Sequence, residues 1–364
     1  MSITRRRSSF RKSRFVLAAV AYQPGPPSVF KIEEASFPEI KPDEIILKVG
    51  ACGVSYRDVV ERNGTYRRDV SFPSIMGIEI AGTVAVIGDQ ISRFSIGDRV
   101  CTKAFSSCGQ CRYCRTGRET TCRQRRVVRG GYAEYVAVAE DAAVLLPDQI
   151  PFESACVLGP GAGVALNAVR DTAHVEIGET VLVTGATGGV GVPAVQLARH
   201  AGATVYAVTR SEDKRQALLD IGAHHVIVQR NGENYGKSLR AELGGEGVDV
   251  VIDTVGSRAF QAAFDALAPH GRYCFVGELT GEEININPAR IFFKRAALLG
   301  VGSVSRVQLE DTVALATQGI IQPQIAKVLP LTRIAEAHRL VESASEMGRI
   351  VVKPDTEYAQ GETE

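Results

Sequence analysis

Four cysteines lie within one short stretch of the chain: Cys108, Cys111 and Cys114 are separated by two-residue gaps, and Cys122 follows eight residues later. Four thiolates at this spacing can surround a Zn²⁺ ion tetrahedrally at about 2.3 Å. They leave no coordination position for a substrate, so such a zinc would be structural. Free buried cysteines are the alternative, which this spacing does not favour. The sequence therefore predicts one structural zinc.

A glycine-rich turn is the second group with chemical meaning. It follows a β-type apolar run at 180–183, opens a helical pattern that extends to residue 201, and is followed by a second strand-like run at 204–208. In this context the glycines let the backbone approach a pyrophosphate at a helix N-terminus. The alternative is an ordinary strand–helix turn without a ligand. We expect a bound dinucleotide, contacted by Gly185, Thr187, Gly188, Gly189 and Val190.

The end of the second strand indicates which dinucleotide is bound. Enzymes that use NAD usually carry an acidic residue there, about 20 residues after the glycines, whereas this chain has Thr209. Arg210 and Lys214 can bind a 2′-phosphate through charge-assisted hydrogen bonds, and Ser211 adds a hydroxyl. These basic residues could instead be a solvated helix start. We favour NADPH as the cofactor.

Further strand-like runs at 248–256, 271–277 and 297–302 favour a parallel sheet, followed by a helix around 308–317. Ligands bind at the carboxyl ends of such strands. We therefore expect Val255, Gly256, Val276 and Gly277 to line the cofactor crevice.

The composition is typical of a soluble α/β protein, with 45% hydrophobic and 23% charged residues among 364. The length suggests two domains, each with its own core. A net charge of +1 gives no electrostatic case for nucleic acid. No continuous apolar run approaches the ~20 residues that span a bilayer, so we expect no membrane partner. One cysteine cluster with four scattered cysteines is typical of a reduced, cytoplasmic protein.

Together these features resemble the medium-chain dehydrogenase/reductase superfamily, which includes zinc alcohol dehydrogenases and quinone and enoyl reductases. Besides the cysteine loop and the glycine turn, the resemblance rests on Gly77-Ile78-Glu79 before Ala81-Gly82-Thr83-Val84, on Gly97-Asp98-Arg99-Val100, and on Gly130-Gly131-Tyr132-Ala133-Glu134-Tyr135. It implies a GroES-like β-rich catalytic domain beside a Rossmann doubly wound parallel sheet, with the active site in the cleft between them. It also implies a homodimer or homotetramer.

The expected organisation follows from this layout. The chain divides into a basic tail (1–14), a GroES-like catalytic domain (15–162) with a zinc lobe (101–126), a Rossmann NADP(H)-binding domain (163–304), a return to the catalytic domain (305–354) and a polar tail (355–364).

The departures from the superfamily concern a second, catalytic zinc. Alcohol dehydrogenases of this kind hold that ion with a cysteine, a histidine and a third cysteine or acid. The matching positions here are Ser55, Ile78 and the pair Gly159-Pro160. Isoleucine cannot bind a metal, and a catalytic zinc needs three protein ligands. Cys52, Glu79 and Cys156 could improvise a set, but we expect that the structural zinc is kept and the catalytic zinc is lost.

Without a Lewis acid, an unactivated ketone is a poor substrate. A hydride added to an α,β-unsaturated carbonyl gives an enolate, which needs orientation, hydrogen bonding and a proton. The segment 52–58 and the kept cysteine loop resemble acryloyl-CoA-type enoyl reductases, so the substrate is a small molecule and could be a CoA thioester. A quinone or carbonyl reductase and a non-catalytic NADPH-binding protein are the alternatives.

The candidate proton donors are Tyr66, which matches an active-site tyrosine of zinc-free enoyl reductases, and Tyr56. Tyr66 could equally be a packed loop residue. Ser55 could hydrogen-bond the substrate carbonyl, while Arg57 and Asp58 are expected to form an internal ion pair.

Several arginines surround the cysteine loop: Arg112, Arg115, Arg118, Arg123, Arg125, Arg126 and Arg129. They could be a solvated surface, or they could contact an anionic group such as a coenzyme A phosphate.

Overall fold

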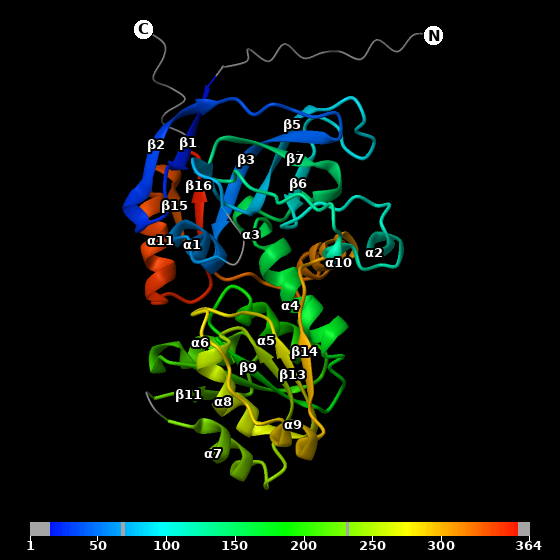
Figure 1. Cartoon of the computed structure of the whole chain (residues 1–364), viewed down its shortest axis with the longest axis vertical. Coiled ribbons are helices and arrows are strands. Elements are labelled where there is room, and N and C mark those ends of the chain that lie inside the picture. The colour runs from blue at the N-terminus through cyan, green and yellow to red at the C-terminus, as the bar shows by residue number, and fades with distance from the viewer. Residues whose placement is uncertain (1–14, 67–69, 231–232, 356–364) are drawn as a thin grey trace.

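The computed structural model describes residues 15–66, 70–230 and 233–355, which form two halves stacked along the long axis of the molecule (Figure 1). The upper half is β-rich, and the lower half contains a sheet covered by helices. The expected basic tail 1–14 and all but the first residue of the expected polar tail 355–364 lie outside the described residues.

The β-rich half contains two sheets. The smaller has the strand order β2-β1-β4, and the larger has the order β15-β16-β3-β5-β6-β8, with β7 also paired to β3. The strands are β1 (Phe15–Ala21), β2 (Phe30–Ser36), β3 (Glu44–Val54), β4 (Ser74–Ile75), β5 (Glu79–Ile87), β6 (Arg99–Thr102), β7 (Tyr135–Ala139), β8 (Ala143–Leu145), β15 (Ile325–Pro330) and β16 (Arg349–Lys353).

The lower half is built on a parallel sheet with the order β11-β10-β9-β12-β13-β14. Numbered from its first strand, this order is 3-2-1-4-5-6, which is that of a doubly wound dinucleotide-binding sheet. Its strands are β9 (Thr180–Thr184), β10 (Thr204–Thr209), β11 (His225–Val228), β12 (Val248–Asp253), β13 (Leu267–Phe275) and β14 (Ala297–Gly300). The predicted last strand, 297–302, therefore ends two residues early.

The central strands of this sheet are apolar without alternation, because both faces are covered. Val181, Leu182 and Val183 of β9 are fully buried, as are Val251 and Ile252 of β12. The continuous apolar runs in the sequence therefore identified these strands correctly.

The helices are α1 (Tyr56–Asn63), α2 (Arg112–Arg115), α3 (Phe152–Ala155), α4 (Val164–Leu166), α5 (Gly191–His200), α6 (Arg215–Asp220), α7 (Tyr235–Glu242), α8 (Ser257–Ala266), α9 (Pro288–Lys294), α10 (Arg306–Thr317) and α11 (Ile334–Ser343). Two of them begin with a capping box, in which a serine and the residue three positions later bond each other's backbone N–H groups. Ser55 and Asp58 cap α1, and Ser305 and Gln308 cap α10. The cap at Ser305 explains why α10 begins before the predicted helix around 308–317.

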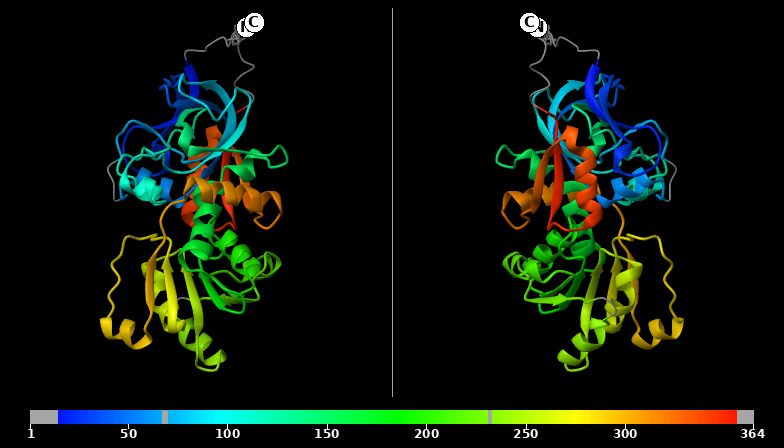
Figure 2. Two further views of the ribbon diagram at one scale, coloured as in Figure 1. Left: turned by 90° about the vertical axis from the view of Figure 1, so that its right-hand side faces the viewer. Right: turned by 90° about the vertical axis from the view of Figure 1, so that its left-hand side faces the viewer.

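The end of the chain returns to the β-rich half. Strand β16 pairs antiparallel with β3, with Ile350 opposite Val54 and Val352 opposite Cys52. Figure 2 shows from both sides that the orange and red elements α10, α11 and β16 lie with the β-rich half, above the parallel sheet. Residues from both ends of the sequence therefore build one sheet.

One hydrophobic cluster connects the halves, since it contains Ala51 and Ala81 together with Val181 and Val195. The segment Phe152–Thr172 passes through it and is, by length and composition, apolar enough to cross a membrane, which the sequence analysis did not anticipate. However, 67% of its apolar window is buried inside the protein, as in the core helix of a soluble protein.

Candidate active site

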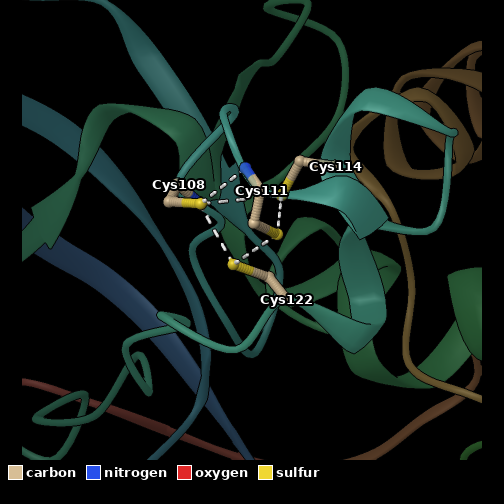
Figure 3. Close-up of side chains that lie close together, drawn as sticks. All are labelled: Cys108, Cys111, Cys114 and Cys122. Atoms are coloured by element: carbon tan, nitrogen blue, oxygen red, sulfur yellow. Dashed lines mark hydrogen bonds between the residues drawn. The ribbon is translucent and has the colours of Figure 1, made fainter.

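The four cysteines converge on one point of the lobe formed by residues 101–126 (Figure 3). Their sulfur atoms all lie within 4.8 Å of one another. The Sγ–Sγ separation is 3.5 Å for Cys111–Cys114, 3.9 Å for Cys108–Cys114 and 4.0 Å for Cys111–Cys122. A zinc ion bonded to four sulfurs at 2.3 Å would separate them by about 3.8 Å. The donor set therefore fits a tetrahedral zinc.

The backbone around these thiols favours their charged form. The N–H of Cys108 donates to Cys122 Sγ, and the N–H of Cys111 donates to Cys108 Sγ, both at 3.4 Å. Backbone N–H bonds, above all from Cys114, lower the pKa of Cys111 to about 6, whereas burial raises the pKa of Cys114 to about 12. A metal bound here would be held by four protein thiolates and would supply rigidity rather than a substrate position.

The lobe is fixed to the rest of the molecule by a buried lysine. Lys103 is 2% exposed, and its Nζ lies 2.6 Å from Glu119 and 3.1 Å from Asp141. Glu119 also accepts the backbone N–H of Arg306 at the start of α10, at 2.6 Å. The lobe is thereby tied both to β-rich elements and to the helix beside it.

The glycine turn lies between β9 and α5. Gly185 has φ +57°, a conformation that favours glycine. A Cβ atom at Gly191 would collide with the carbonyl oxygen of Gly185, so only glycine allows the helix to start this close to the strand. The predicted residues Gly185, Thr187, Gly188, Gly189 and Val190 all belong to this turn, at the N-terminus of α5.

Sequence reasoning missed Arg349, which lies directly against this turn. A Cβ atom at Gly189 would collide with its guanidinium group, and the neighbouring Gly348 N–H donates to Thr187 O at 2.8 Å. Arg349 in turn donates to Glu79 Oε1 at 2.8 Å, and the second oxygen of Glu79 is buried without a partner among the described residues. No local sequence pattern predicts the Glu79–Arg349 pair, because its members are 270 positions apart.

The residues predicted to bind a 2′-phosphate differ in how accessible their side chains are to a ligand. Thr209 is buried at the end of β10, and its Oγ1 accepts the N–H of Ser211 at 3.2 Å. Lys214 donates to the carbonyl oxygens of Ala344 and Glu346, at 3.0 and 2.9 Å. Arg210 is exposed, which leaves it as the accessible cation at this strand end.

The other predicted cofactor residues follow neighbouring strands. Val255 and Gly256 come directly after β12. Val276 and Gly277 come directly after β13, and both donate their backbone N–H groups to Asp253 O, at 2.8 and 3.2 Å. The buried Asp253 carboxylate accepts from Thr184 at 2.5 Å, from Tyr273 at 2.7 Å, and from two backbone N–H groups. Asp253 was not predicted, and it joins β9, β12 and β13 near the carboxyl ends of these strands, where the cofactor is expected.

The predicted ion pair between Arg57 and Asp58 is wrong. Arg57 Nε donates instead to Glu61 Oε1 at 2.9 Å, one helical turn later. Asp58 accepts the hydroxyl of Ser55 at 2.6 Å and its backbone N–H at 2.8 Å. The single hydroxyl hydrogen of Ser55 is therefore engaged with Asp58, and donation to a substrate carbonyl would require that bond to break.

The two candidate tyrosines flank α1. Tyr56 is its first residue, and Tyr66 follows its C-terminal cap, Gly64. The ring of Tyr66 lies 5.2 Å from the Arg57 guanidinium, so it faces the helix near its start, two residues from Ser55. Both tyrosines are partly exposed and accessible.

The positions that match the catalytic-zinc ligands carry a different donor set. Ile78 is buried, and Gly159 is so close to Thr102 O that a Cβ atom there would collide with it. Burial raises the pKa of both Cys52 and Cys156 well above its usual range. In residues 15–66, 70–230 and 233–355, one group of three or more His, Cys, Asp or Glu side chains lies close enough together to hold a metal ion. That group is the four-cysteine cluster.

Comparison with known proteins agrees with this geometry. Residues 41–148 match the alcohol dehydrogenase GroES-like domain, and residues 189–318 match the zinc-binding dehydrogenase domain. The chain belongs to the medium-chain dehydrogenase/reductase superfamily. As a member of this superfamily it is an oxidoreductase, with a GroES-like domain and a Rossmann-like domain.

Individual relatives are similar to this chain over nearly their whole length. An acryloyl-coenzyme A reductase of Sulfurisphaera tokodaii is 33% identical over 336 residues, covering 91% of this chain and 98% of the relative. A quinone oxidoreductase of Sus scrofa is 31% identical, covering 90% and 94%. The crystal structure of AibC superposes with a TM-score of 0.89 at 34% identity, covering 97% of this chain and all of the other.

We expect about one zinc per chain, lost on replacement of a cluster cysteine. Cys111→Ser should reduce the zinc content measured by elemental analysis to near zero and lower the thermal unfolding midpoint, since loss of a structural metal is among the few single changes that exceed about 4 kcal/mol. Cys274→Ala, in β13 outside the cluster, should keep the zinc. About two zinc ions per wild-type chain would contradict the assignment of a single site.

Stability should depend on pH through Glu79. Burial raises the pKa of Glu79 to about 7 from 4.5, although Arg349 opposes the shift. Between these values the folded chain keeps a proton that the unfolded chain releases, so stability falls as pH rises through this window. The unfolding free energy of the wild type, relative to Glu79→Gln, should fall by up to about 3 kcal/mol from pH 4.5 to 7.

Glu153→Gln is the matched control with the opposite sign. Partial burial opposes ionisation there, but the bond from Lys353 lowers the pKa of Glu153 overall. The contribution of Glu153 should be constant above pH 4.5 and disappear below it. Parallel pH profiles for the wild type and Glu79→Gln would show that folding does not raise the pKa of Glu79.

Proposed function

We propose that this protein is an NADPH-dependent reductase that adds a hydride to the activated C=C bond of an α,β-unsaturated carbonyl compound or enoyl thioester, without a catalytic zinc. The observation that carries the proposal is the chemistry at the three ligand positions. A serine bonded to an aspartate, a buried isoleucine and a close-packed glycine offer no set of three metal ligands. The substrate itself must then delocalise the charge that hydride addition creates.

The proposed reaction needs few groups from the protein. Bound NADPH would supply the hydride, which goes to the β-carbon of the substrate while the C=C electrons move to form an enolate. The residues of this chain would orient the reactants and deliver one proton to the α-carbon. Tyr66 is the proposed donor because its side chain is partly exposed and its ring lies 5.2 Å from the guanidinium of Arg57, at the start of α1. Tyr56 is the second candidate.

The choice of NADPH is supported by the end of β10. Thr209 replaces the acid that would bond a ribose 2′-hydroxyl, and Glu212 is neutralised by a salt bridge to Arg215. Arg210 is exposed and has room for a phosphate. Lys214 adds positive charge nearby, although its amine is bonded to carbonyl oxygens.

A quinone is the second candidate acceptor. The similarity to the quinone oxidoreductase of Sus scrofa favours it, and hydride addition to a quinone also gives a stabilised oxyanion. The slightly higher identity to an acryloyl-coenzyme A reductase, together with the arginines of the zinc lobe, favours the thioester.

We also propose a homo-oligomer. Strand β14 is an edge strand of the parallel sheet with Leu298 37% exposed, and the adjacent helix α9 exposes Phe292 and Phe293 by 60% and 77%. Exposed apolar side chains beside an unpaired sheet edge are typical of an interface between chains.

Arg210 should decide the cofactor preference. Arg210→Gln should raise the Kd for NADPH about ten- to hundredfold, because it removes a charge-assisted hydrogen bond, and should leave the Kd for NADH unchanged. Fluorescence titration of both cofactors measures this. Lys214→Gln is the comparison, with a smaller expected effect; a larger effect at Lys214 than at Arg210 would reverse the assignment.

The reaction class is tested by following NADPH oxidation with crotonyl-CoA, a quinone and an aldehyde, with identification of the products. We expect stoichiometric formation of the saturated thioester. Tyr66→Phe should lower kcat at least about a hundredfold, the usual contribution of general acid catalysis. Tyr56→Phe is the matched control with little effect. Turnover of the quinone alone would refute the enoyl reductase, and an effect confined to Tyr56→Phe would move the proton donor there.

A further inference from the structure

We propose that the arginine-bearing surface of the zinc lobe binds the phosphate groups of a coenzyme A thioester, with Arg123 and Arg125 as the anion-binding residues and Phe105 as the surface along which the pantetheine arm lies. This inference deepens the proposed function and rests on it, because a quinone carries no phosphate.

The lobe has a large local excess of positive charge in a chain whose net charge is only +1. Residues 101–126 contain seven basic side chains and one acid, Glu119, which is engaged with the buried Lys103. Arg126 finds its carboxylates outside the lobe, at Asp43 and Glu44. Within the described part of the chain, the remaining five arginines have no carboxylate within 4 Å: Arg112, Arg115, Arg118, Arg123 and Arg125.

Two guanidinium groups converge on one aromatic ring. Arg125 lies 4.8 Å from the centre of Phe105, and Arg57 lies 4.9 Å from it. Each is attracted to the ring, although the two cations repel each other. The charge of Arg57 is compensated by the fully buried Glu61. Arg129 lies 2.8 Å from the other carboxylate oxygen of Glu61. Among the described residues, the guanidinium group of Arg125 has one polar contact, to Thr120 O at 3.0 Å, so its charge is available to an anion.

The same ring connects this charge with the proposed proton donor. Arg57 touches both Phe105 and Tyr66, at 4.9 and 5.2 Å, and Phe105 comes three residues after the end of β6. Tyr66, Arg57, Phe105 and Arg125 therefore form one continuous series of ring–guanidinium contacts. Arg123, two residues before Arg125, is exposed and lies 5.7 Å from the ring centre of Tyr113.

The chemistry of coenzyme A matches this arrangement. The molecule carries its reactive acyl group at one end of an extended, largely apolar arm and its phosphates at the other. With the acyl group at Tyr66, the arm would follow Phe105 and the phosphates would meet the arginines. A guanidinium group suits this role, because its planar donors can form two parallel bonds to one phosphate.

Neutralisation of a zinc tetrathiolate is the competing explanation for the arginines. The contacts of the cluster do not support it. Among the described residues, its sulfurs accept backbone N–H groups and contact one another, not arginine side chains. Arg125 and Arg123 are directed instead to the rings of Phe105 and Tyr113.

The test compares crotonyl-CoA with the crotonyl thioester of N-acetylcysteamine, which has the same reacting group and no phosphate. The Arg123→Gln/Arg125→Gln double variant should lose about a hundredfold in kcat/KM for crotonyl-CoA, or about 2.7 kcal/mol, and nothing for the truncated thioester. Lys237→Gln, which removes an exposed charge from α7, is the matched control and should change neither. Zinc content is measured in each variant.

Calorimetric titration with free coenzyme A, and with pantetheine as its phosphate-free counterpart, separates this proposal from the proposed function. Binding of coenzyme A that the arginine variant loses, without turnover of either thioester, would support the site and refute the reductase. Equal kcat/KM for both thioesters, with no binding of coenzyme A, would overturn the site and leave the reductase standing. Loss of zinc from the double variant would assign the arginines to the metal and overturn the proposal.

Discussion

The β-rich sheet and the cofactor turn are joined by one buried polar contact, between Glu79 at the start of β5 and Arg349 at the start of β16. Removing Glu79 would leave the largely buried Arg349 guanidinium without its partner, which is far more costly than breaking an exposed pair. Arg349 also packs against Gly189, so the pair links the β-rich sheet to the cofactor turn. The backbone bond from Gly348 to Thr187 fixes the same contact. The position of the cofactor turn relative to the β-rich sheet is therefore fixed by residues at the start of β16.

The same sheet explains how the candidate site is organised without the usual metal ligands. Ser55 caps α1 and bonds Asp58, so the position that would hold a cysteine ligand instead stabilises the start of a helix. That helix presents Arg57 to the rings of Tyr66 and Phe105. Substitution of the ligands therefore leaves an ordered site with a different chemistry.

Features encoded locally could be predicted from the sequence, and those made by distant residues could not. The glycine turn and the four cysteines are contiguous, and the central strands are continuous apolar runs. One local signal was overlooked: Ser55 followed three residues later by Asp58 is a capping-box pattern, which excludes the expected Arg57–Asp58 pair. By contrast, the bonds from Lys214 to residues 344 and 346 depend on the return of the chain, and no pattern near either end indicates them.

The zinc lobe shows why a metal without an open coordination position still matters to function. The lobe has little hydrophobic core, since the buried apolar residues in 101–126 are Cys101, Ala104 and Cys122. Its shape is instead held by the cysteine cluster and by Lys103 with its two carboxylates. These contacts fix Phe105 beside Arg57 of α1, which belongs to a different part of the β-rich half. A metal at the cysteines would therefore act on the substrate side through position alone, because it stiffens the loop that carries Phe105 and Arg125.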